Sequence, residues 1–409
     1  MNQFAAFGKT IPEGSDPENQ LFNLGSTSVP RIDKDEFLTW PTEYGNAHVT
    51  LWKDGKTGVV TMTVDDNIMA EFAFWNELLL QYGLPTTFIA PTSGYSEAAS
   101  MWQYETALGQ AVQSHTHGHP SGGDYANMST AEVWMDFYLG YLEIGKYSGS
   151  PSRIIGYSYG WNNAEYSSKI YIAGRGTTGS ANGVTATNYN QTASFSGLNS
   201  SYMTKFNAIT EGSGRGGWCS VHWHSVSRST DLVRQIYASL YELSEQRKIW
   251  TATFADAAMY GQERDTSTLT VTGSSDNVFS FVLTDRMNDN YYDFPLTVAI
   301  RADSRWQAAA AMQNGVEREV EVVEKDGATY LLVQAVPDRG EVTVRRLTLS
   351  GEQTEDGMIS FVPEEASNSL SSLCRKTFTF TVDESWQHAW AVQDGSALPV
   401  RLYTEAGVR

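Results

Sequence analysis

Two clusters of polar residues in the N-terminal part of the chain carry side chains that can bind a divalent metal ion. Asp65 and Asp66 are adjacent, and the later segment Ser-His-Thr-His-Gly-His-Pro at 114–120 contains three histidines. One carboxylate and two imidazoles form a ligand set of catalytic zinc sites, with a coordination position left for water. The same set can hold iron for oxygen chemistry. A second carboxylate and the later histidines His222 and His224 suit hydrolysis better.

Each cluster follows a predicted strand. The apolar run 59–64 leads directly into the aspartates, and the shorter run 111–112 leads into the histidines. Active sites of barrels and open α/β sheets collect at the carboxyl ends of strands, so we expect the two clusters to converge. Taken alone, the two aspartates could equally cap a helix that begins near Ile68, and the histidine cluster favours a site instead.

Four segments, taken in order, resemble the motifs of the polysaccharide deacetylases, the NodB-homology or carbohydrate esterase family 4 enzymes. They are Thr-Val-Asp-Asp at 63–66, His-Thr-x-x-His-Pro at 115–120, Tyr-Ser-Tyr-Gly at 157–160, and the late His224. The resemblance covers roughly residues 45–265. A lone His-x-x-x-His pair would be a weak signal, whereas four motifs in family order are specific. The resemblance implies removal of acetyl groups from N- or O-acetylated sugars of a polysaccharide.

The resemblance also implies a ligand set and a general base. Asp66, His115 and His119 would hold the divalent metal, with zinc as the expected ion. Asp65 would take the proton of the attacking water. Some division of labour between the aspartates is expected in any case, because neighbouring residues on a strand point to opposite sides. His117 has no family role, and we expect it to lie outside the ligand set.

Two further functional groups come from the same resemblance. The backbone N–H of Tyr159 would donate to the oxyanion of the tetrahedral intermediate. His224 would protonate the leaving group, because it follows an apolar strand and precedes small residues, as in the family's final motif. His222 lies on the same side of that strand and is the alternative acid, or a support for it. Trp218 and Trp223 could wall an acyl pocket, and core packing explains them at least as well.

The chain departs from the family pattern at two places. The family's Arg-Pro-Pro-Tyr-Gly motif is replaced by residues 153–160, which puts Arg153 too early in the chain to pair with the base; Arg175 is another candidate. An Asp-x-x-Asp-Trp motif is missing between residues 174 and 218. Asp256 could orient the histidine in its place, although we favour a helix-capping role for it. These departures affect the identity of the substrate more than the prediction of hydrolysis.

Short apolar runs that alternate with helical periodicity predict repeated β and α elements between residues 46 and 265. We expect strands at 59–64, 86–90, 111–112, 153–159, 219–224 and 249–254, and helices at 68–82, 96–110, 130–146, 231–246 and 255–263. This order implies a parallel sheet covered by helices, and the resemblance implies a distorted (β/α)7 barrel of the NodB type. Residues 1–45, which lack periodicity, are expected to form an irregular N-terminal arm.

From residue 266 to 409 the sequence changes to short alternating runs separated by turn residues, which predicts an all-β, sandwich-like module. The pattern Asp303-x-x-Trp306-Gln307, followed by Gln-Asn-Gly, recurs as Asp383-x-x-Trp386-Gln387, followed by Gln-Asp-Gly. Two related β units and a coincidence of short segments both remain open. Asn-Gly and Asp-Gly favour tight hairpin turns, and we expect both tryptophans to be core residues rather than sugar platforms.

Composition limits the classes of partner. The chain has 28 basic and 47 acidic side chains, and its formal charge of −19 opposes binding to nucleic acid or anionic membranes. An acetylated neutral or amino-sugar polymer fits better. Neither a transmembrane run nor a signal peptide is recognised. Because a cell-wall or dietary glycan lies outside the cell, we nevertheless expect a secreted or periplasmic protein.

Two alternatives to a deacetylase remain. One keeps the barrel and the metal and assigns cleavage of a different bond, in a small amide or a glycan. The other is an inactive barrel that binds glycan through its aromatic residues, of which there are 21 Tyr, 17 Phe and 12 Trp. Asp65 argues against this last alternative, since an inert site has no reason to retain a base.

Overall fold

The computed structural model describes residues 34–94, 99–149, 151–161 and 163–347, and short strands between residues 349 and 408. The described chain divides into two compact units. The first contains Thr50–Thr268 and Asp285–Leu296, and the second contains Trp40–Val49, Leu269–Thr284 and the chain from Thr297 onwards. Residues 1–33 of the expected arm and the repeat around Trp386 lie outside the described residues.

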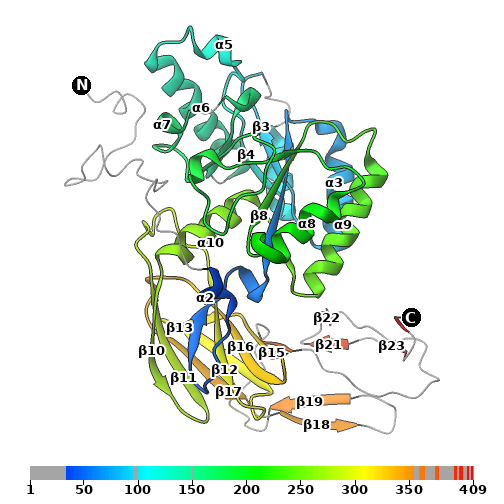
Figure 1. Cartoon of the computed structure of the whole chain (residues 1–409), viewed down its shortest axis with the longest axis vertical. Coiled ribbons are helices and arrows are strands. Elements are labelled where there is room, and N and C mark those ends of the chain that lie inside the picture. The colour runs from blue at the N-terminus through cyan, green and yellow to red at the C-terminus, as the bar shows by residue number, and fades with distance from the viewer. Residues whose placement is uncertain are drawn as a thin grey trace. The chain divides into compact units, whose positions relative to one another are not determined.

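The first unit is built on a parallel sheet (Figure 1). Its central strand β2 (Gly58–Asp65) is buried along its whole length. The strand order is β6-β5-β4-β3-β2-β8-β7, and β9 also pairs with β2. The other strands are β3 (Thr87–Ala90), β4 (Ala111–Ser114), β5 (Ile154–Gly156), β6 (Ala173–Arg175), β7 (Phe195–Ser196), β8 (Trp218–Trp223) and β9 (Ile249–Ala252). Every registered pair in this sheet is parallel.

Helices surround this sheet (Figure 1), and their ends follow local sequence signals. Helix α6 begins with a capping box between Ser129 and Glu132 and ends at Gly149, whose φ of 80° is left-handed. Thr253 caps α10 in the same way as Ser129 caps α6. The longer helices are α3 (Phe72–Tyr82), α4 (Ala99–Leu108), α6 (Thr130–Ser148), α8 (Tyr202–Thr210), α9 (Thr230–Glu245) and α10 (Phe254–Thr266).

Shorter helical elements complete the connections. They are α2 (Lys34–Leu38), α5 (Gly122–Tyr125) and α7 (Ala164–Ser167), with single 3₁₀ turns η2 (Lys53–Gly55), η3 (Met69–Glu71), η4 (Ser158–Gly160), η5 (Tyr189–Gln191) and η6 (Gly212–Gly214). The apolar core joins the central strands to α3, α8 and α9 through buried residues that include Val64, Trp75, Phe88, Val221 and Ile236. No helix within the described ranges is both long and apolar enough to cross a membrane.

The second unit consists of two five-stranded sheets. One has the order β1-β12-β16-β15-β20, and the other has the order β10-β11-β17-β13-β14. The first contains β1 (Ala47–Val49), β12 (Leu296–Ala302), β16 (Ala328–Ala335), β15 (Val320–Lys325) and β20 (Cys374–Lys376). The second contains β10 (Thr268–Ser274), β11 (Val278–Thr284), β17 (Val342–Leu347), β13 (Ala308–Gln313) and β14 (Val316–Arg318). The registered pairs are antiparallel except for β15 and β20.

Three two-stranded pairs follow in the C-terminal part of the chain. They are β18 (Leu349–Gln353) with β19 (Ile359–Pro363), β21 (Ala391–Gln393) with β22 (Ser396–Leu398), and β23 (Tyr403–Thr404) with β24 (Gly407–Val408). The fold class predicted from the sequence, a distorted β/α barrel of the NodB type followed by an all-β module, is confirmed.

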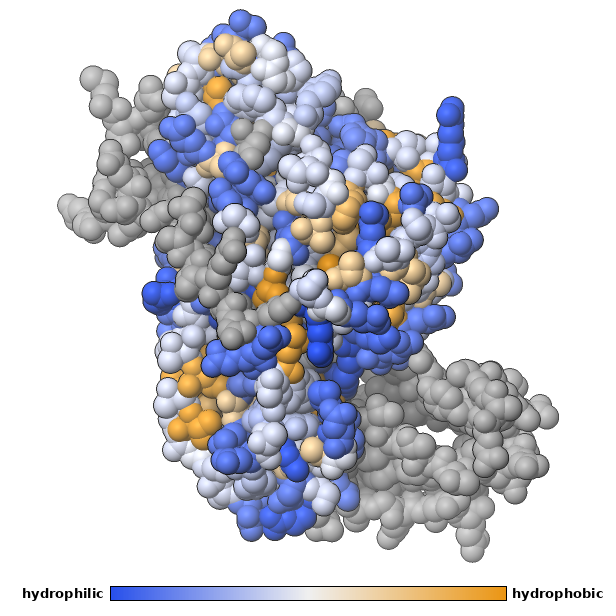
Figure 2. All heavy atoms as spheres, in the orientation of Figure 1, coloured by the Kyte–Doolittle hydropathy of each residue, from blue (hydrophilic) through white to orange (hydrophobic). Residues whose placement is uncertain are grey.

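Local details of the β module agree with its turn chemistry. Asn314 and Gly315 join β13 to β14 with φ values of 48° and 79°, which is the geometry of a tight two-residue hairpin. Trp306 is fully buried, and its ring stacks on Phe279 with the centroids 4.7 Å apart. Trp306 is therefore a core residue, as expected. Most of the face seen in Figure 2 is hydrophilic, and apolar residues occur on it in small groups.

Two of the differences from the sequence-based expectations concern β5 and β1. The strand expected at 153–159 ends at Gly156, because the chain turns through η4, where Tyr159 has a left-handed φ of 53°. Residues 47–49 form β1, which pairs with β12 of the β module, although the sequence-based barrel began near His48. No strand was predicted at these residues, and a local sequence pattern does not specify which sheet a strand joins.

Candidate metal centre and active site

The two aspartates occupy the carboxyl end of the central strand. Asp65 is the last residue of β2 and is 2% exposed. Asp66 and Asn67 follow with left-handed φ values of 67° and 54°, which turn the chain sharply away from the strand direction. The Asn67 side chain accepts a hydrogen bond from Trp102 Nε1 at 2.8 Å, which anchors this turn in the core. The turn leaves the Asp66 carboxylate accessible beside the buried Asp65.

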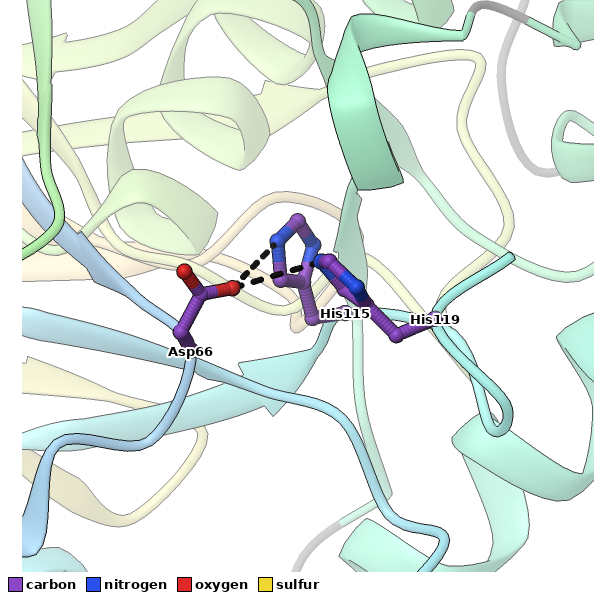
Figure 3. A group of neighbouring side chains, drawn as sticks. All are labelled: Asp66, His115 and His119. Carbon is purple, nitrogen blue, oxygen red and sulfur yellow. Dashed lines mark ion pairs between the residues drawn. The ribbon is translucent and has the colours of Figure 1, made fainter. Parts of the chain in front are cut away.

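The histidines lie at the carboxyl end of β4, a strand of the same sheet as β2, as expected. His115 comes directly after β4, and His119 lies in the loop that follows. His115 Nε2 lies 3.5 Å from Asp66 Oδ1, and His119 Nε2 lies 3.3 Å from the same oxygen. Figure 3 shows the two rings and the carboxylate pointing toward one another. One ligand atom from each residue lies within 4.8 Å of the others, so the three side chains could hold one metal ion.

The hydrogen bonding of His115 tests whether the triad fits a metal. Its Nδ1 lies 2.7 Å from the Gly156 carbonyl oxygen, which can only accept, so Nδ1 must carry the proton. In the neutral ring, Nε2 then presents a lone pair toward Asp66. A second ring nitrogen that is fixed by a backbone carbonyl is typical of metal-binding histidines. A cation between the ring and the carboxylate would satisfy both, and the donor set fits zinc.

Asp66 has the electrostatic environment of a ligand that is always ionised. Contacts with His115 and His119 lower the pKa of the Asp66 carboxyl below its ordinary value, with a further contribution from the charge of His224, and they outweigh the opposite effect of partial burial. Asp66 therefore carries a negative charge at neutral pH. This charge favours a bound cation.

The histidine loop is held from beneath by Asp136 on α6. One Asp136 carboxylate oxygen accepts a hydrogen bond from the Gly118 N–H at 2.6 Å, and the other accepts one from the Tyr125 hydroxyl at 2.8 Å. The Asp136 carbonyl accepts a third from the His117 N–H at 3.2 Å. Gly140 lets α6 approach, since a methyl group there would lie 2.5 Å from Ser114 Oγ. Sequence reasoning missed Asp136; an acidic residue on the apolar face of a helix was its available signal.

His117 lies outside the triad, as expected. Its Nδ1 is 2.8 Å from Oγ1 of Thr92, a residue of the loop that follows β3, so the ring of His117 contacts that loop. The cluster of possible ligands contains His115 and His119 but not this residue. His117 therefore helps to hold the loop, and the i,i+4 pair on either side of it belongs to the group that could hold a metal ion.

Asp65 forms a buried ion pair with Arg175. The Arg175 Nη2 atom lies 2.6 Å from both carboxylate oxygens of Asp65, and the Arg175 side chain is fully buried at the end of β6. Arg153 is directed elsewhere, toward the Tyr291 carbonyl and the Asp293 carboxylate. The partner of Asp65 is thus Arg175, one of the candidates from the sequence. Breaking such a buried pair leaves an uncompensated charge, which makes Arg175 important for the position of Asp65.

Gly156 makes room for this ion pair. A methyl group at this position would lie 2.7 Å from Arg175 Nη2 and 2.6 Å from Ile89 Cγ2. The Gly156 carbonyl also fixes His115, so one residue at the end of β5 serves both halves of the site. Sequence reasoning missed this role. A glycine inside a predicted strand is the signal that could have identified a close approach of another group.

The two late histidines differ sharply in environment. His224 is exposed over 58% of its side chain, and its Nε2 lies 3.8 Å from Asp66 Oδ2. His222 is buried, and because the Ser194 hydroxyl donates to the Gly176 carbonyl at 2.6 Å, His222 Nδ1–H donates to Ser194 Oγ at 2.7 Å. Burial, followed by the charge of Arg175, lowers the pKa of His222 to about 4. His222 is therefore neutral at pH 7.

Tyr159 lies at the rim of the triad. Its left-handed backbone closes the turn after β5, its ring is 72% exposed, and the ring centroid is 5.0 Å from that of His119. Asp256 lies in the first turn of α10, where its N–H donates to the Thr253 hydroxyl, so the residue that caps this helix is Thr253 and not Asp256. Trp218 is a core residue whose indole N–H donates to Thr61 Oγ1 at 2.9 Å.

Unusual backbone geometry gathers at this site. Among the described residues, ten non-glycine residues have positive φ, and five of them belong to the triad or are near it in sequence or space: Asp66, Asn67, Thr116, His119 and Tyr159. Each such conformation is unfavourable for an L residue and persists only where the surrounding structure requires it. Strained residues of this kind cluster at functional sites, so the backbone independently indicates that the triad is functional.

No protein-family model matches the chain. A gellan lyase from Bacillus sp. is 30% identical over 359 residues, which is 80% of this chain and 14% of that protein. The chain therefore spans about one seventh of the length of this relative.

Three solved structures are among those that match about half of the chain. The Xyl-CE4 domain of a multidomain xylanase from the hindgut metagenome of Trinervitermes trinervoides is 20% identical, with a TM-score of 0.34 over 48% of this chain and 88% of that one. A family 4 carbohydrate esterase from Streptomyces lividans is 17% identical, with a TM-score of 0.33 over 48% and 92%. The peptidoglycan deacetylase PdaC from Bacillus subtilis is 16% identical, with a TM-score of 0.34 over 49% and 90%.

Proposed function

We propose that the first unit is a metal-dependent hydrolase that removes acetyl groups from the N- or O-acetylated sugars of a polysaccharide. The observation that carries this proposal is the convergence of Asp66, His115 and His119 beside the buried pair of Asp65 and Arg175. A ligand triad adjacent to an independent carboxylate provides both parts that acyl hydrolysis requires, a metal site and a base. The order of motifs in the sequence points to the same chemistry.

Each residue has a distinct role in the proposed mechanism. A divalent ion held by the triad, with zinc as the best fit, supplies Lewis acidity toward the acyl oxygen and the attacking water. Asp65, held in place by Arg175, takes a proton from that water. The backbone N–H of Tyr159 donates to the oxyanion as negative charge develops on the acyl oxygen. His224 then protonates the leaving amine or alkoxide, which cannot depart easily as an anion.

The environments of the two histidines support His224 as the acid. A proton donor to the leaving group must reach the substrate, and His224 is exposed beside the triad. His222 is buried, donates to Ser194 and is neutral at pH 7, so it has no proton to give from Nε2. We assign His222 a structural role: it is bound to Ser194 and lies close enough to Asp65 and Arg175 to interact with their charges.

The similarity to a gellan lyase favours one alternative function. A lyase that acts on a polysaccharide also needs a base and a proton donor, and Asp65 and His224 could take these roles in an elimination. The chain covers only a small part of that relative, so the cleaving activity named for it can reside elsewhere in its length. Both functions share a glycan substrate outside the cell. A secreted or periplasmic location therefore belongs to the proposal.

The deciding experiment measures two products on the same reactions. Purified protein, metal-stripped protein and the Asp65→Asn variant are incubated with acetylated chitin oligomers, peptidoglycan, acetylated xylan and gellan, each also in deacetylated form. Free acetate reports hydrolysis, and a new ultraviolet absorbance from an unsaturated sugar end reports elimination. We expect acetate from acetylated substrates only, and loss of release in both controls. Unsaturated ends without acetate would establish the lyase, and glycan binding without either product would establish the inactive binder.

A further inference from the structure

Glu71 binds the loop that follows the strand carrying the late histidines. It lies at the end of η3, in the connection that begins with Asp66. One carboxylate oxygen of Glu71 accepts from the Ser225 hydroxyl at 2.5 Å and from the Ser227 N–H at 3.1 Å. The other accepts from the Val226 N–H at 3.0 Å. Three consecutive residues of the loop are thus tied to one side chain.

This loop begins with His224, whose imidazole has a ring contact with His222, at 6.0 Å between the centroids. More than half of the His224 side chain is exposed, so packing does not fix the imidazole, and its ring nitrogen approaches Asp66 at 3.8 Å. Its position is therefore set by the backbone on either side. On one side Trp223 is registered with Val64 of β2. On the other side the chain is held by Glu71.

We infer that Glu71 is a positioning residue that holds His224 over the metal triad, and this inference rests on the proposed function. Hydrogen bonds from N–H and O–H groups to an ionised carboxylate are about twice as strong as neutral ones, so three of them together define one loop conformation. The same connection carries Asp66, so the acid and the metal ligand share one support. A displacement of about 1 Å in such a group can reduce turnover about 100-fold.

The loop could instead be a structural anchor whose loss affects every reaction equally. A proton donor to the leaving group gives a way to tell the two apart. An acetamide or an alkyl acetate has a strongly basic leaving group that needs a proton, whereas 4-nitrophenyl acetate releases a stable phenolate that does not. A residue that acts through His224 matters only for the first kind of substrate.

The experiment compares Glu71→Ala and Glu71→Gln with His224→Ala and the double variant Glu71→Ala/His224→Ala. Glu77→Ala is the matched control, because Glu77 is also a glutamate that links α3 to the chain after β8, through Arg234. For an acetylated sugar we expect Glu71→Ala to lower kcat about 100-fold with KM little changed, and Glu71→Gln to lose less. In the His224→Ala background the same change should have little further effect. Hydrolysis of 4-nitrophenyl acetate and metal content should stay near their original values in Glu71→Ala, Glu71→Gln and Glu77→Ala.

Three outcomes would overturn the inference. Equal losses on both substrates would make Glu71 a general anchor. Full additivity of Glu71→Ala and His224→Ala would show that Glu71 does not act through the histidine, and an equal loss in Glu77→Ala would remove its specificity. If the unaltered protein releases no acetate from any substrate, the proposed function itself fails and the inference fails with it. Activity that is indifferent to Glu71 refutes the inference alone.

Discussion

Replacement of Gly156 by alanine tests the Asp65–Arg175 pair without removing either charge. The added methyl group would lie 2.7 Å from Arg175 Nη2 and 2.6 Å from Ile89 Cγ2, well inside normal contact distances. Arg175 is fully buried and cannot swing into solvent, so the guanidinium must shift along the end of β5. Because both oxygens of Asp65 rest on a single nitrogen of Arg175, that shift also moves the carboxylate.

The expected magnitude follows from the crowding. Forcing one extra methyl into a packed site costs about 1–3 kcal/mol of folding free energy, and a domain of this size loses about 2–4 °C in melting temperature per kcal/mol. Turnover should fall by about 100-fold, since a misplaced base loses its alignment with the attacking water. Calorimetry and acetate release on the same preparation measure the two effects.

The matched control is Gly123→Ala in α5. A methyl group there would meet only Ser121 Oγ, at 3.7 Å, so folding and turnover should stay close to their original values. Metal content must be measured as well, because the Gly156 carbonyl fixes the proton of His115. A Gly156→Ala variant with normal metal content and full activity would refute the argument that Arg175 must occupy this position for catalysis.

Three further predictions concern individual side chains. Asp65→Asn should keep the metal and lose about two to four orders of magnitude in turnover, whereas Asp66→Asn should lose metal first; equal metal loss in both would contradict the assignment. His115→Ala should abolish metal binding in a titration and His117→Ala should preserve it. Burial, followed by the charge of Asp285, raises the pKa of Glu263 to about 10. This carboxyl is protonated when folded, so its stabilising contribution is complete below the ordinary pKa of about 4.5 and is lost as pH rises toward 10. Glu263→Gln should therefore be more stable than the original protein at pH 7.5, by at most about 4 kcal/mol, and equally stable at pH 4; an unchanged difference across this range in denaturant unfolding would contradict it.

Sequence patterns predicted the elements that local chemistry specifies. The apolar run at 59–64 became β2, extended by one residue at each end, and the helix predicted at 130–146 became α6, which begins at Thr130. The convergence of Asp66, His115 and His119 was predictable because parallel strands present their carboxyl ends at one edge. These inferences need only the pattern of residues close together in the chain and the rule that active sites lie at the carboxyl ends of parallel strands.

Contacts between side chains that are far apart in the chain could not be predicted from the sequence. Asp65 and Arg175 are 110 positions apart, and the sequence offered Arg175 only as one of two candidates, beside Arg153. Asp136 and Glu71 act by accepting backbone N–H groups, and every residue except proline can supply such a donor, so no side-chain pattern reveals the pairing. Charged residues on helices and turns are usually solvated. The place of Asp136 on the apolar face of α6 was a signal in the sequence, whereas only three-dimensional contacts identify Glu71.

The order of segments along the chain has a consequence for protein synthesis. β1 is made before the parallel sheet, but its partner β12 begins only at Leu296, after that sheet is complete. At about 5–20 residues per second, a ribosome that has finished Val49 needs roughly ten seconds or more to reach Leu296. During this time β1 waits as an unpaired edge that other strands can capture. The parallel unit is likewise left without Asp285–Leu296 until late. The two units interleave in the chain, so neither can be completed before translation has passed through part of the other.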